Sequence, residues 1–344
     1  MLRSLSSMPL RHILSHPLPH VMRVQRRHKS TTAEEAAKNL IMRFKGTTHM
    51  ATQMLDGNQL QKLSLTLNRR ELYPGLDITA SPPPDGTVIP PGYHLVYFTP
   101  GGVEDELGLD GTDASYNAPA PFTRRMWAGG RMRWRGDGMD LKVGDEVMEQ
   151  TTLMSATPKR SRDGSEMVLV EVWKGFSGPK GLVLVDERSW IFRPEATAES
   201  PAARGTLRDA VIRGPSTVKD VPQDGAYPQR QLRWSPTGLF RFSALTFNGH
   251  KIHYDPTWSA AVEGHPGCVV HGPLNLISML DYWRDHCDPE GREIREITYR
   301  AVAPIYAGET YGISAEEAGE LKWDMLVRKE GKTCMKGEIL GWAR

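Results

Sequence analysis

Residues 242–255 read FSALTFNGHKIHYD, and residues 263–274 read EGHPGCVVHGPL. The first stretch places the amide of Asn248 and the imidazole of His253 five residues apart, and we expect both to follow a strand. The second stretch leads through Gly272 into a helix, whose first N–H groups have no internal partner and carry partial positive charge. These features predict a site that binds a developing oxyanion beside a histidine.

The predicted helix begins at Gly272-Pro273. Proline suits the first helical position because its φ angle is already fixed and its missing N–H is not needed there. A glycine at this entry would let a substrate carbonyl approach the backbone closely. The residues that form the apolar stripe of the helix are Leu276, Ile277, Leu280 and Trp283.

Two further helices are predicted near the N-terminus. Thr32 and Glu35 have the spacing of a capping box, and a second helical pattern follows Asp56. Elsewhere, short apolar runs rich in β-forming residues predict strands. These runs are 93–98, 167–173, 182–185, 190–192, 242–246, 297–302, 322–327 and 334–340.

The two halves of the sequence contain a similar turn pattern. Residues 141–147 read LKVGDEV and residues 305–311 read IYAGETY, and each precedes predicted strands. The pattern predicts a duplicated α+β unit in which one long helix packs against an antiparallel sheet, twice. We expect an N-terminal unit at 34–198, a polar linker at 199–228 and a C-terminal unit at 229–344.

Residues 1–33 differ from the rest of the chain. They contain six basic residues, no acidic residue and interspersed serines, as in a mitochondrial transit peptide. The alternative is a basic tail. Removal of these residues would change the formal charge from +2 to −4, which argues against nucleic-acid binding.

The remaining composition narrows the class of protein. Three cysteines at irregular spacing indicate neither a disulfide framework nor a zinc knuckle. No apolar run approaches the roughly 18 residues that a membrane span needs. The histidines near the motif lack an HExxH pattern or a cysteine pair, so we predict no metal site and no cofactor.

The quoted stretches resemble the hydratase motif of the MaoC-like double hot-dog dehydratases, in particular the hydroxyacyl-thioester dehydratase type 2 branch and related mesaconyl-CoA-type hydratases. The wider family carries Ser-Gly-Asp-x-Asn-Pro-aliphatic-His and a later His-Gly. Residues 246–253 and His271-Gly272 match these places, and the likeness extends over most of 70–344. One departure is Asn248, which stands where the wider family has aspartate.

The resemblance implies an α+β double hot-dog fold and a hydro-lyase that interconverts 3-hydroxyacyl and 2-enoyl thioesters. It implies that His253 transfers the proton, that Asn248 holds the water or hydroxyl, and that Gly272 N–H stabilises the thioester oxygen. Because an amide cannot exchange a proton as a carboxylate can, His253 would carry most of the acid–base chemistry. The N-terminal unit, whose His94 has no such motif around it, would be non-catalytic and form part of the acyl tunnel.

The implied role is dehydration in fatty-acid synthesis in the mitochondrial matrix, with acyl carrier protein or CoA presenting the substrate. Two alternatives stay open: a hydratase of a short dicarboxylic acyl-CoA of mesaconyl or itaconyl type, and a non-catalytic protein that binds acyl thioesters. The sequence leaves chain length, carrier, stereochemistry and oligomeric state open.

Overall fold

The computed structural model describes residues 31–136, 138–195, 211–288 and 293–343. Nearly all of the predicted transit peptide therefore lies outside the described residues. Residues 196–210, which belong largely to the predicted linker, lie outside them as well. No helix in the described ranges is long and apolar enough to cross a membrane.

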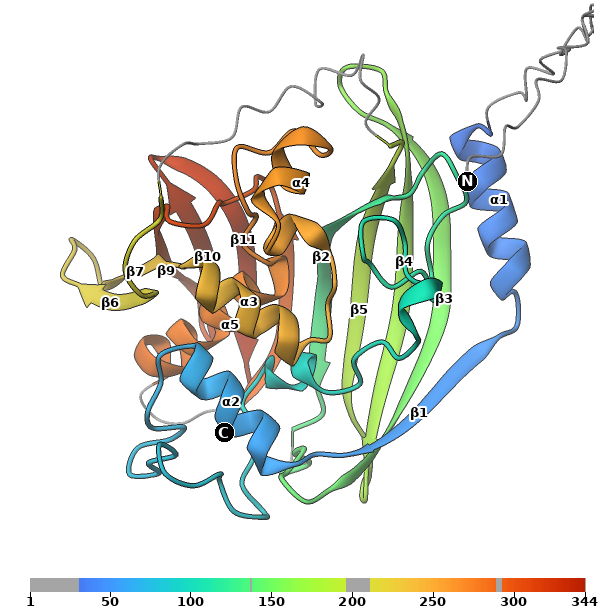
Figure 1. Ribbon diagram of the computed structural model, residues 1–344. Coiled ribbons are helices and arrows are strands. Elements are labelled where there is room, and N and C mark those ends of the chain that lie inside the picture. The colour runs from blue at the N-terminus through green and yellow to red at the C-terminus, as the bar shows by residue number, and fades with distance from the viewer. Residues whose placement is uncertain (1–30, 137, 196–210, 289–292, 344) are drawn as a thin grey trace, which may run out of the picture. The chain divides into compact units, whose positions relative to one another are not determined.

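The described strands form one continuous antiparallel sheet with the order β1-β3-β4-β5-β2-β8-β11-β10-β9-β7-β6. Figure 1 shows the N-terminal strands in blue to green and the C-terminal strands in yellow to red. The bounds are β1 Thr48–Met54, β2 Arg124–Trp134, β3 Glu146–Arg160, β4 Glu166–Gly178, β5 Gly181–Arg193, β6 Thr217–Val221, β7 Gln229–Arg233, β8 Ile294–Ala301, β9 Thr310–Gly319, β10 Lys322–Lys329 and β11 Lys332–Gly341.

The sheet consists of two halves with the same topology. They join where β2 pairs with β8, with Gly130 opposite Tyr299. Outward from this junction the order is β5, β4, β3, β1 on one side and β11, β10, β9, β7 on the other. The predicted duplication and the α+β double hot-dog class are therefore confirmed.

The two similar turn patterns occupy equivalent places in these halves. Gly144 has φ of 88° and Gly308 has φ of 80°, a conformation that glycine adopts without strain. The chain enters β3 just after the first turn and β9 just after the second. The shared sequence pattern therefore reflects the same turn used twice.

The helices lie in the chain segments between the strands, and they pack on the sheet. The bounds are α1 Ala33–Phe44, α2 Gly57–Thr66, η1 Tyr93–Val96, η2 Glu104–Glu106, α3 Pro236–Leu245, η4 Lys251–His253, α4 Pro256–Ala261, α5 Gly272–Tyr282 and η5 Trp283–Cys287, which is a π-helical turn. The capping box predicted at Thr32 is present at the start of α1, and Asp56 caps α2.

The C-terminal half contains the predicted long helix. All residues of α5 from Leu274 to Tyr282 are buried, and η5 continues it to Cys287. The helix lies so close to β11 that a Cβ atom at Gly337 would come 2.5 Å from Met279 Sδ. This helix and the surrounding strands form most of the main core.

The N-terminal half departs from the prediction of one long helix per half. In the equivalent stretch between β1 and β2, residues 93–96 form only the single turn η1. The strand predicted at 93–98 is therefore wrong. Gly92 has φ of 85° and starts the turn, and the consecutive residues Tyr93–Tyr97 are all buried, so their apolar run reflects burial on every side rather than a pleated strand.

Helix α1 supplies a second, smaller core. It lies beside β3 in Figure 1, and its small residues pack against valines of β4. Its last residue, Phe44, stacks on Tyr116 with ring centroids 4.6 Å apart. The N-terminal sheet is thus covered in part by α1 and by the loop that carries Tyr116.

Two other sequence predictions need correction. Residues 242–246 were expected to form a strand, but they lie in and just after α3, because Ser235 caps this helix and Pro236 takes its first position. Part of the predicted linker at 199–228 is strand β6, which pairs with β7.

Candidate active site

A cavity of about 1370 Å³ lies between the two halves. The three residues that the motif singled out, His253, Asn248 and Gly272, all line it. The motif side contributes the loop after α3, the segment before α5 and the first turn of α5. The opposite wall comes from strands β2, β3, β4 and β5 of the N-terminal half.

The segment that presents Asn248 and His253 follows a helix rather than the expected strand. Helix α3 ends at Thr246, and Phe247 adopts φ of 47°, which turns the chain. A loop of the N-terminal half docks on this segment, since Lys251 N–H donates to Asp110 O at 2.8 Å. The motif is therefore held in place by both halves.

The geometry of His253 fixes which ring nitrogen is available. Its Nδ1 lies 2.7 Å from the carbonyl oxygen of Val269. Because a carbonyl only accepts, Nδ1 carries the hydrogen and Nε2 carries the free lone pair. Burial, with a contribution from His250, lowers the pKa of His253 to about 3. The imidazole is thus neutral near pH 7 and able to accept a proton.

His271 holds the His253 ring from the other side. The two rings stack with centroids 3.6 Å apart and an interplanar angle of 17°. His271 Nε2 lies 2.9 Å from Ser243 Oγ on α3. Burial, with the neighbouring His253, lowers the pKa of His271 well below its ordinary value, so two neutral rings lie face to face.

Gly272 is the first residue of α5, and it lies against Trp127 of β2. A Cβ atom at this position would come 2.9 Å from Trp127 Cδ1. From the sequence, close approach of the substrate is the predicted reason for this glycine. The structure supplies a different one, which is the close packing of the indole on the helix end.

Asn248 combines turn chemistry with exposure to the cavity. Its Oδ1 accepts a hydrogen bond from His250 N–H at 3.0 Å. Its amide nitrogen makes no hydrogen bond to any residue that the structure describes, and the side chain lines the cavity. The turn therefore holds the oxygen of Asn248, and the amide nitrogen keeps its donors unused by the described residues.

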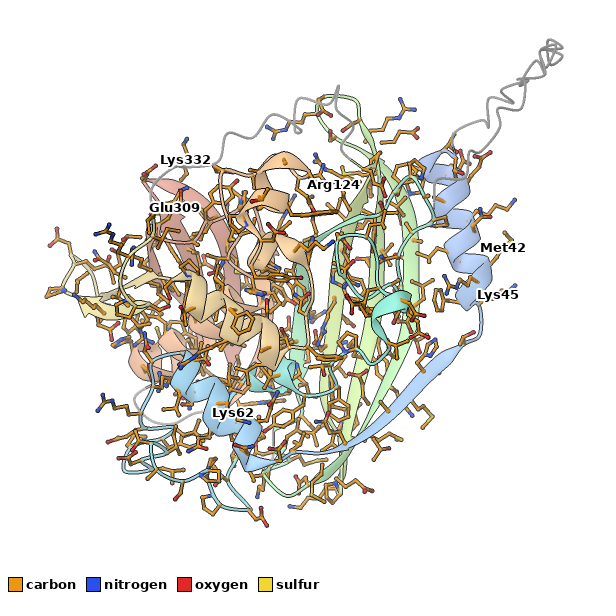
Figure 2. All side chains as sticks on the ribbon, viewed as in Figure 1. Met42, Lys45, Lys62, Arg124, Glu309 and Lys332 are labelled. Atoms are coloured by element: carbon orange, nitrogen blue, oxygen red, sulfur yellow. The ribbon has the colours of Figure 1, made fainter. Side chains whose placement is uncertain are left out.

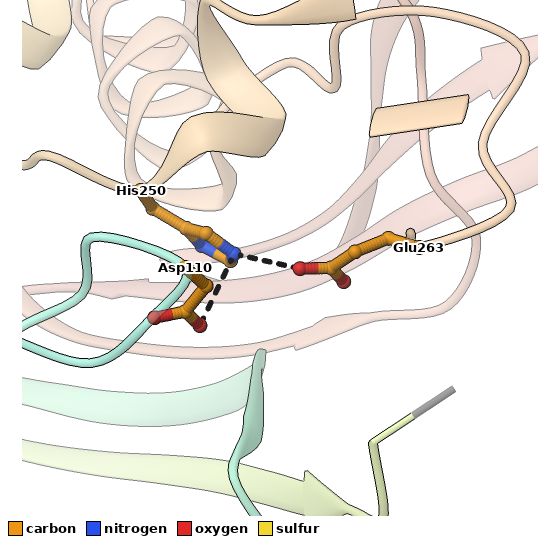
Figure 3. A group of neighbouring side chains, drawn as sticks. All are labelled: Asp110, His250 and Glu263. Atoms are coloured by element: carbon orange, nitrogen blue, oxygen red, sulfur yellow. Dashed lines mark hydrogen bonds and ion pairs between the residues drawn. The ribbon is translucent and has the colours of Figure 1, made fainter. Parts of the chain in front are cut away.

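A cluster of charged and polar side chains beside His253 is not indicated by any sequence pattern. Figure 3 shows His250 between two carboxylates from different parts of the chain, with Nε2 3.2 Å from Glu263 Oε1 and 3.6 Å from Asp110 Oδ2. Burial acts to raise the pKa of Glu263, but the interactions with His250, Arg124 and His265 together outweigh it and lower the pKa to about 2. No sequence spacing brings these residues together.

The same three side chains are the residues best placed to hold a metal ion, since their ligand atoms lie within 4.8 Å of one another. However, Arg124 at the start of β2 also reaches Glu263, with Nε 3.3 Å from Oε2 (Figure 2 labels Arg124). A cation already beside this carboxylate disfavours a second one. The cluster is best described as an ion-pair network that fixes His250.

Comparisons with known proteins identify the family. Residues 92–307 match the family model for hydroxyacyl-thioester dehydratase type 2. The chain is 31% identical to a mesaconyl-C(4)-CoA hydratase of Chloroflexus aurantiacus, over 69% of this chain and 80% of that protein. It is 25% identical to a mitochondrial hydroxyacyl-thioester dehydratase type 2 of Schizosaccharomyces pombe, over 68% and 80%.

Solved structures agree on the fold. A MaoC-like dehydratase from Phytophthora capsici superposes with a TM-score of 0.61 at 16% identity, covering 89% of this chain and 99% of that one. The HtdX protein of Mycobacterium tuberculosis superposes with a TM-score of 0.56 at 14% identity, covering 86% and 100%.

Proposed function

The chain belongs to the hydroxyacyl-thioester dehydratase type 2 family, and we propose that its cavity hydrates 2-enoyl thioesters and dehydrates 3-hydroxyacyl thioesters with His253 as the proton-transfer group. It is an enzyme of the hydro-lyase class, as its named relatives are. The observation that carries the proposal is that His253 and Gly272 at the start of α5 line one cavity.

In the dehydration direction, His253 Nε2 takes the proton from C2 as the C2–C3 double bond forms. The C3–O bond breaks, and the same nitrogen returns the proton to the departing hydroxyl, which leaves as water. His253 suits both steps because its ring is neutral before the reaction, so that Nε2 can accept the proton and return it from the same atom. Val269 O and the stacked His271 ring keep Nε2 aimed at one place.

Asn248 and Gly272 donate hydrogen bonds to two different oxygen atoms of the reactants. The amide of Asn248 donates to the oxygen of the water or hydroxyl, which suits an amide that cannot exchange a proton itself. The N–H of Gly272 donates to the thioester oxygen as charge develops on it, supported by the partial positive charge of the helix end.

One physiological role is 3-hydroxyacyl-thioester dehydration in mitochondrial fatty-acid synthesis, with the substrate on acyl carrier protein. The mitochondrial relative in S. pombe supports a mitochondrial location, and we place the chain in the matrix. The basic, acid-free residues 1–30 fit an import signal.

A second role is hydration of a short dicarboxylic acyl-CoA. The 31% identity to a mesaconyl-C(4)-CoA hydratase favours it. In this role CoA, rather than acyl carrier protein, presents the substrate.

The test is an absorbance assay of the purified full chain with crotonyl-CoA, a ten-carbon 2-enoyl-CoA and the same acyl groups on acyl carrier protein. We expect loss of the enoyl-thioester absorbance with at least one substrate. Binding without turnover across this set and the mesaconyl thioester would refute the proposal and leave a protein that only binds acyl thioesters.

A further inference from the structure

The wall of the cavity opposite the motif carries buried charges. Arg188 on β5 and Lys174 on β4 both line the cavity that contains His253. Their positions in the sheet are adjacent, because Lys174 lies opposite Asp186 in the β4–β5 register and Arg188 is two residues further along β5. Both side chains therefore project from the concave face of the N-terminal half.

Each cation has an acidic partner. Arg188 lies 2.6 Å from Asp186 Oδ2, and Asp186 is fully buried. Lys174 Nζ lies 2.8 Å from Glu149 Oε1. Buried ion pairs add little to stability compared with apolar residues of similar size. Core stability alone therefore does not explain two such pairs on a cavity wall.

Both side chains line the cavity and have more hydrogen-bond donors than their acidic partners use. Asp186 Oδ2 accepts from two N–H groups of Arg188. A guanidinium has five N–H groups in all. Lys174 donates to Glu149 and to Thr151 Oγ1, which uses two of its three protons.

Trp127 places this wall next to the candidate active site. The Arg188 guanidinium lies over its ring, 5.7 Å from the centroid. The Cβ–Cγ–Cδ1 edge of the same side chain packs against Gly272. Its indole N–H is buried and finds no hydrogen-bond partner among the described residues. Trp127 thus contacts both the start of α5 and the Arg188 guanidinium, and all three residues line the same cavity.

We propose that Arg188 and Lys174 bind the carboxylate at the far end of a short dicarboxylic acyl thioester, with the thioester carbonyl at Gly272. This inference rests on the proposed function and selects the second of its two roles. A carboxylate would accept charge-assisted hydrogen bonds from the remaining donors. A long apolar chain would instead desolvate both ion pairs without supplying any partner.

The first test compares two substrates that differ only at this end. Mesaconyl-C(4)-CoA carries a methyl group and a carboxylate on C3, counted from the thioester, and 3-methylcrotonyl-CoA carries two methyl groups there. We expect kcat/KM of the wild-type chain to be at least about 100-fold higher for the dicarboxylic substrate, because a polar site rejects an analogue that leaves its groups unpaired.

The second test changes the subsite. Replacing Arg188→Gln together with Asp186→Asn removes both charges and leaves no single buried charge behind. The preference for the dicarboxylic substrate should then fall about 100-fold, mainly through a higher KM. Lys174→Gln is the second variant and should reduce the same preference. The matched control is Arg133→Gln, since Arg133 on β2 pairs with Glu187 on β5 and neither residue lines the cavity.

The possible outcomes distinguish failure of this inference from failure of the proposed function. Turnover of 3-methylcrotonyl-CoA or longer enoyl-CoAs at rates equal to or above mesaconyl-C(4)-CoA would overturn this inference and leave the proposed function intact. Equal losses on both substrates in the variants would show that the ion pairs are structural only and would also overturn it. Absence of turnover with every thioester would overturn the proposed function, and this inference with it.

Discussion

The two halves of the sheet share one strand order, yet only the C-terminal half encloses a long helix. In that half α5 fills the concave face with apolar side chains. In the N-terminal half the equivalent segment is the single turn η1, and the concave face lines the cavity instead. The comparison indicates that the substrate compartment arises where one copy of a duplicated unit has lost its helix.

The two halves also contribute different chemical groups to the cavity. The helix end and the stacked imidazoles belong to the C-terminal half, whereas the buried ion pairs belong to the N-terminal wall. His94 of the N-terminal half does not contribute to the cavity lining; it is 2% exposed and its Nε2 lies 3.4 Å from Asp186. One half would therefore perform the reaction while the other selects the acyl group.

The largest effect is expected from His253→Ala. Loss of a general acid–base group lowers kcat by about 10²–10⁴-fold. The measurement is enoyl-thioester absorbance under saturating substrate. His286→Gln, which changes a histidine of the same half outside the cavity, is the control. Turnover of His253→Ala within threefold of wild type would break the assignment of catalysis to the C-terminal half.

A smaller loss of activity is expected from Gly272→Ala. The added methyl group would press on Trp127 and displace the helix end, and loss of one oxyanion donor typically lowers kcat by about 10²–10³-fold. Gly267→Ala is the control because its Cβ meets nothing within 4 Å. If both variants had the same kcat, Gly272 would have no role in the reaction.

Core truncations should differ between the two halves. Leu280→Ala in α5 removes a side chain that is 1% exposed, and it should lower the free energy of unfolding by about 2–5 kcal/mol. Leu95→Ala in η1 should lower it by only about 1–2 kcal/mol, because Leu95 borders an existing cavity. Urea denaturation measures both. Equal losses would contradict the idea that η1 is a degenerate helix.

The smallest effect concerns pH. The pKa of His253 is about 3 in the folded chain, below its ordinary value of 6.5. Between these values the unfolded chain binds more protons, so stability is fully present above pH 6.5 and falls as the pH is lowered toward 3. The slope from this residue is at most about 1.4 kcal/mol per pH unit.

His253→Gln should therefore flatten the dependence of unfolding free energy on pH between about 6 and 4. Urea denaturation at several pH values measures the slope for the variant and for wild type. Identical slopes would mean that the His253 ring is not held neutral by burial.

Short sequence patterns correctly predicted several elements, because these elements form through interactions between neighbouring residues. The capping box at Thr32, the Gly-Pro entry to α5 and the turn glycines Gly144 and Gly308 each depend on a few neighbouring residues. The motif itself identified His253, Asn248 and Gly272, and the structure places all three on one cavity. Their roles in the reaction stay predictions.

Other features of the structure are not indicated by any short sequence pattern. The stretch 242–246 has β-forming residues, yet the Ser235 cap and the burial of Leu239 and Phe242 favour a helix. Nothing in the sequence marks Glu263 and Asp110 as partners of His250, because they come from separate loops. Arg188 and Lys174 likewise look like ordinary strand residues until the sheet is folded.

The sequence by itself determined the family, the presence of a duplicated unit and the position of the motif, since these depend on residue type and short spacing. Only the tertiary structure decided that one half lacks its helix, which imidazole nitrogen is free and which charges line the cavity. These properties depend on contacts between segments far apart in the chain, and burial of that kind leaves no fixed spacing in the sequence.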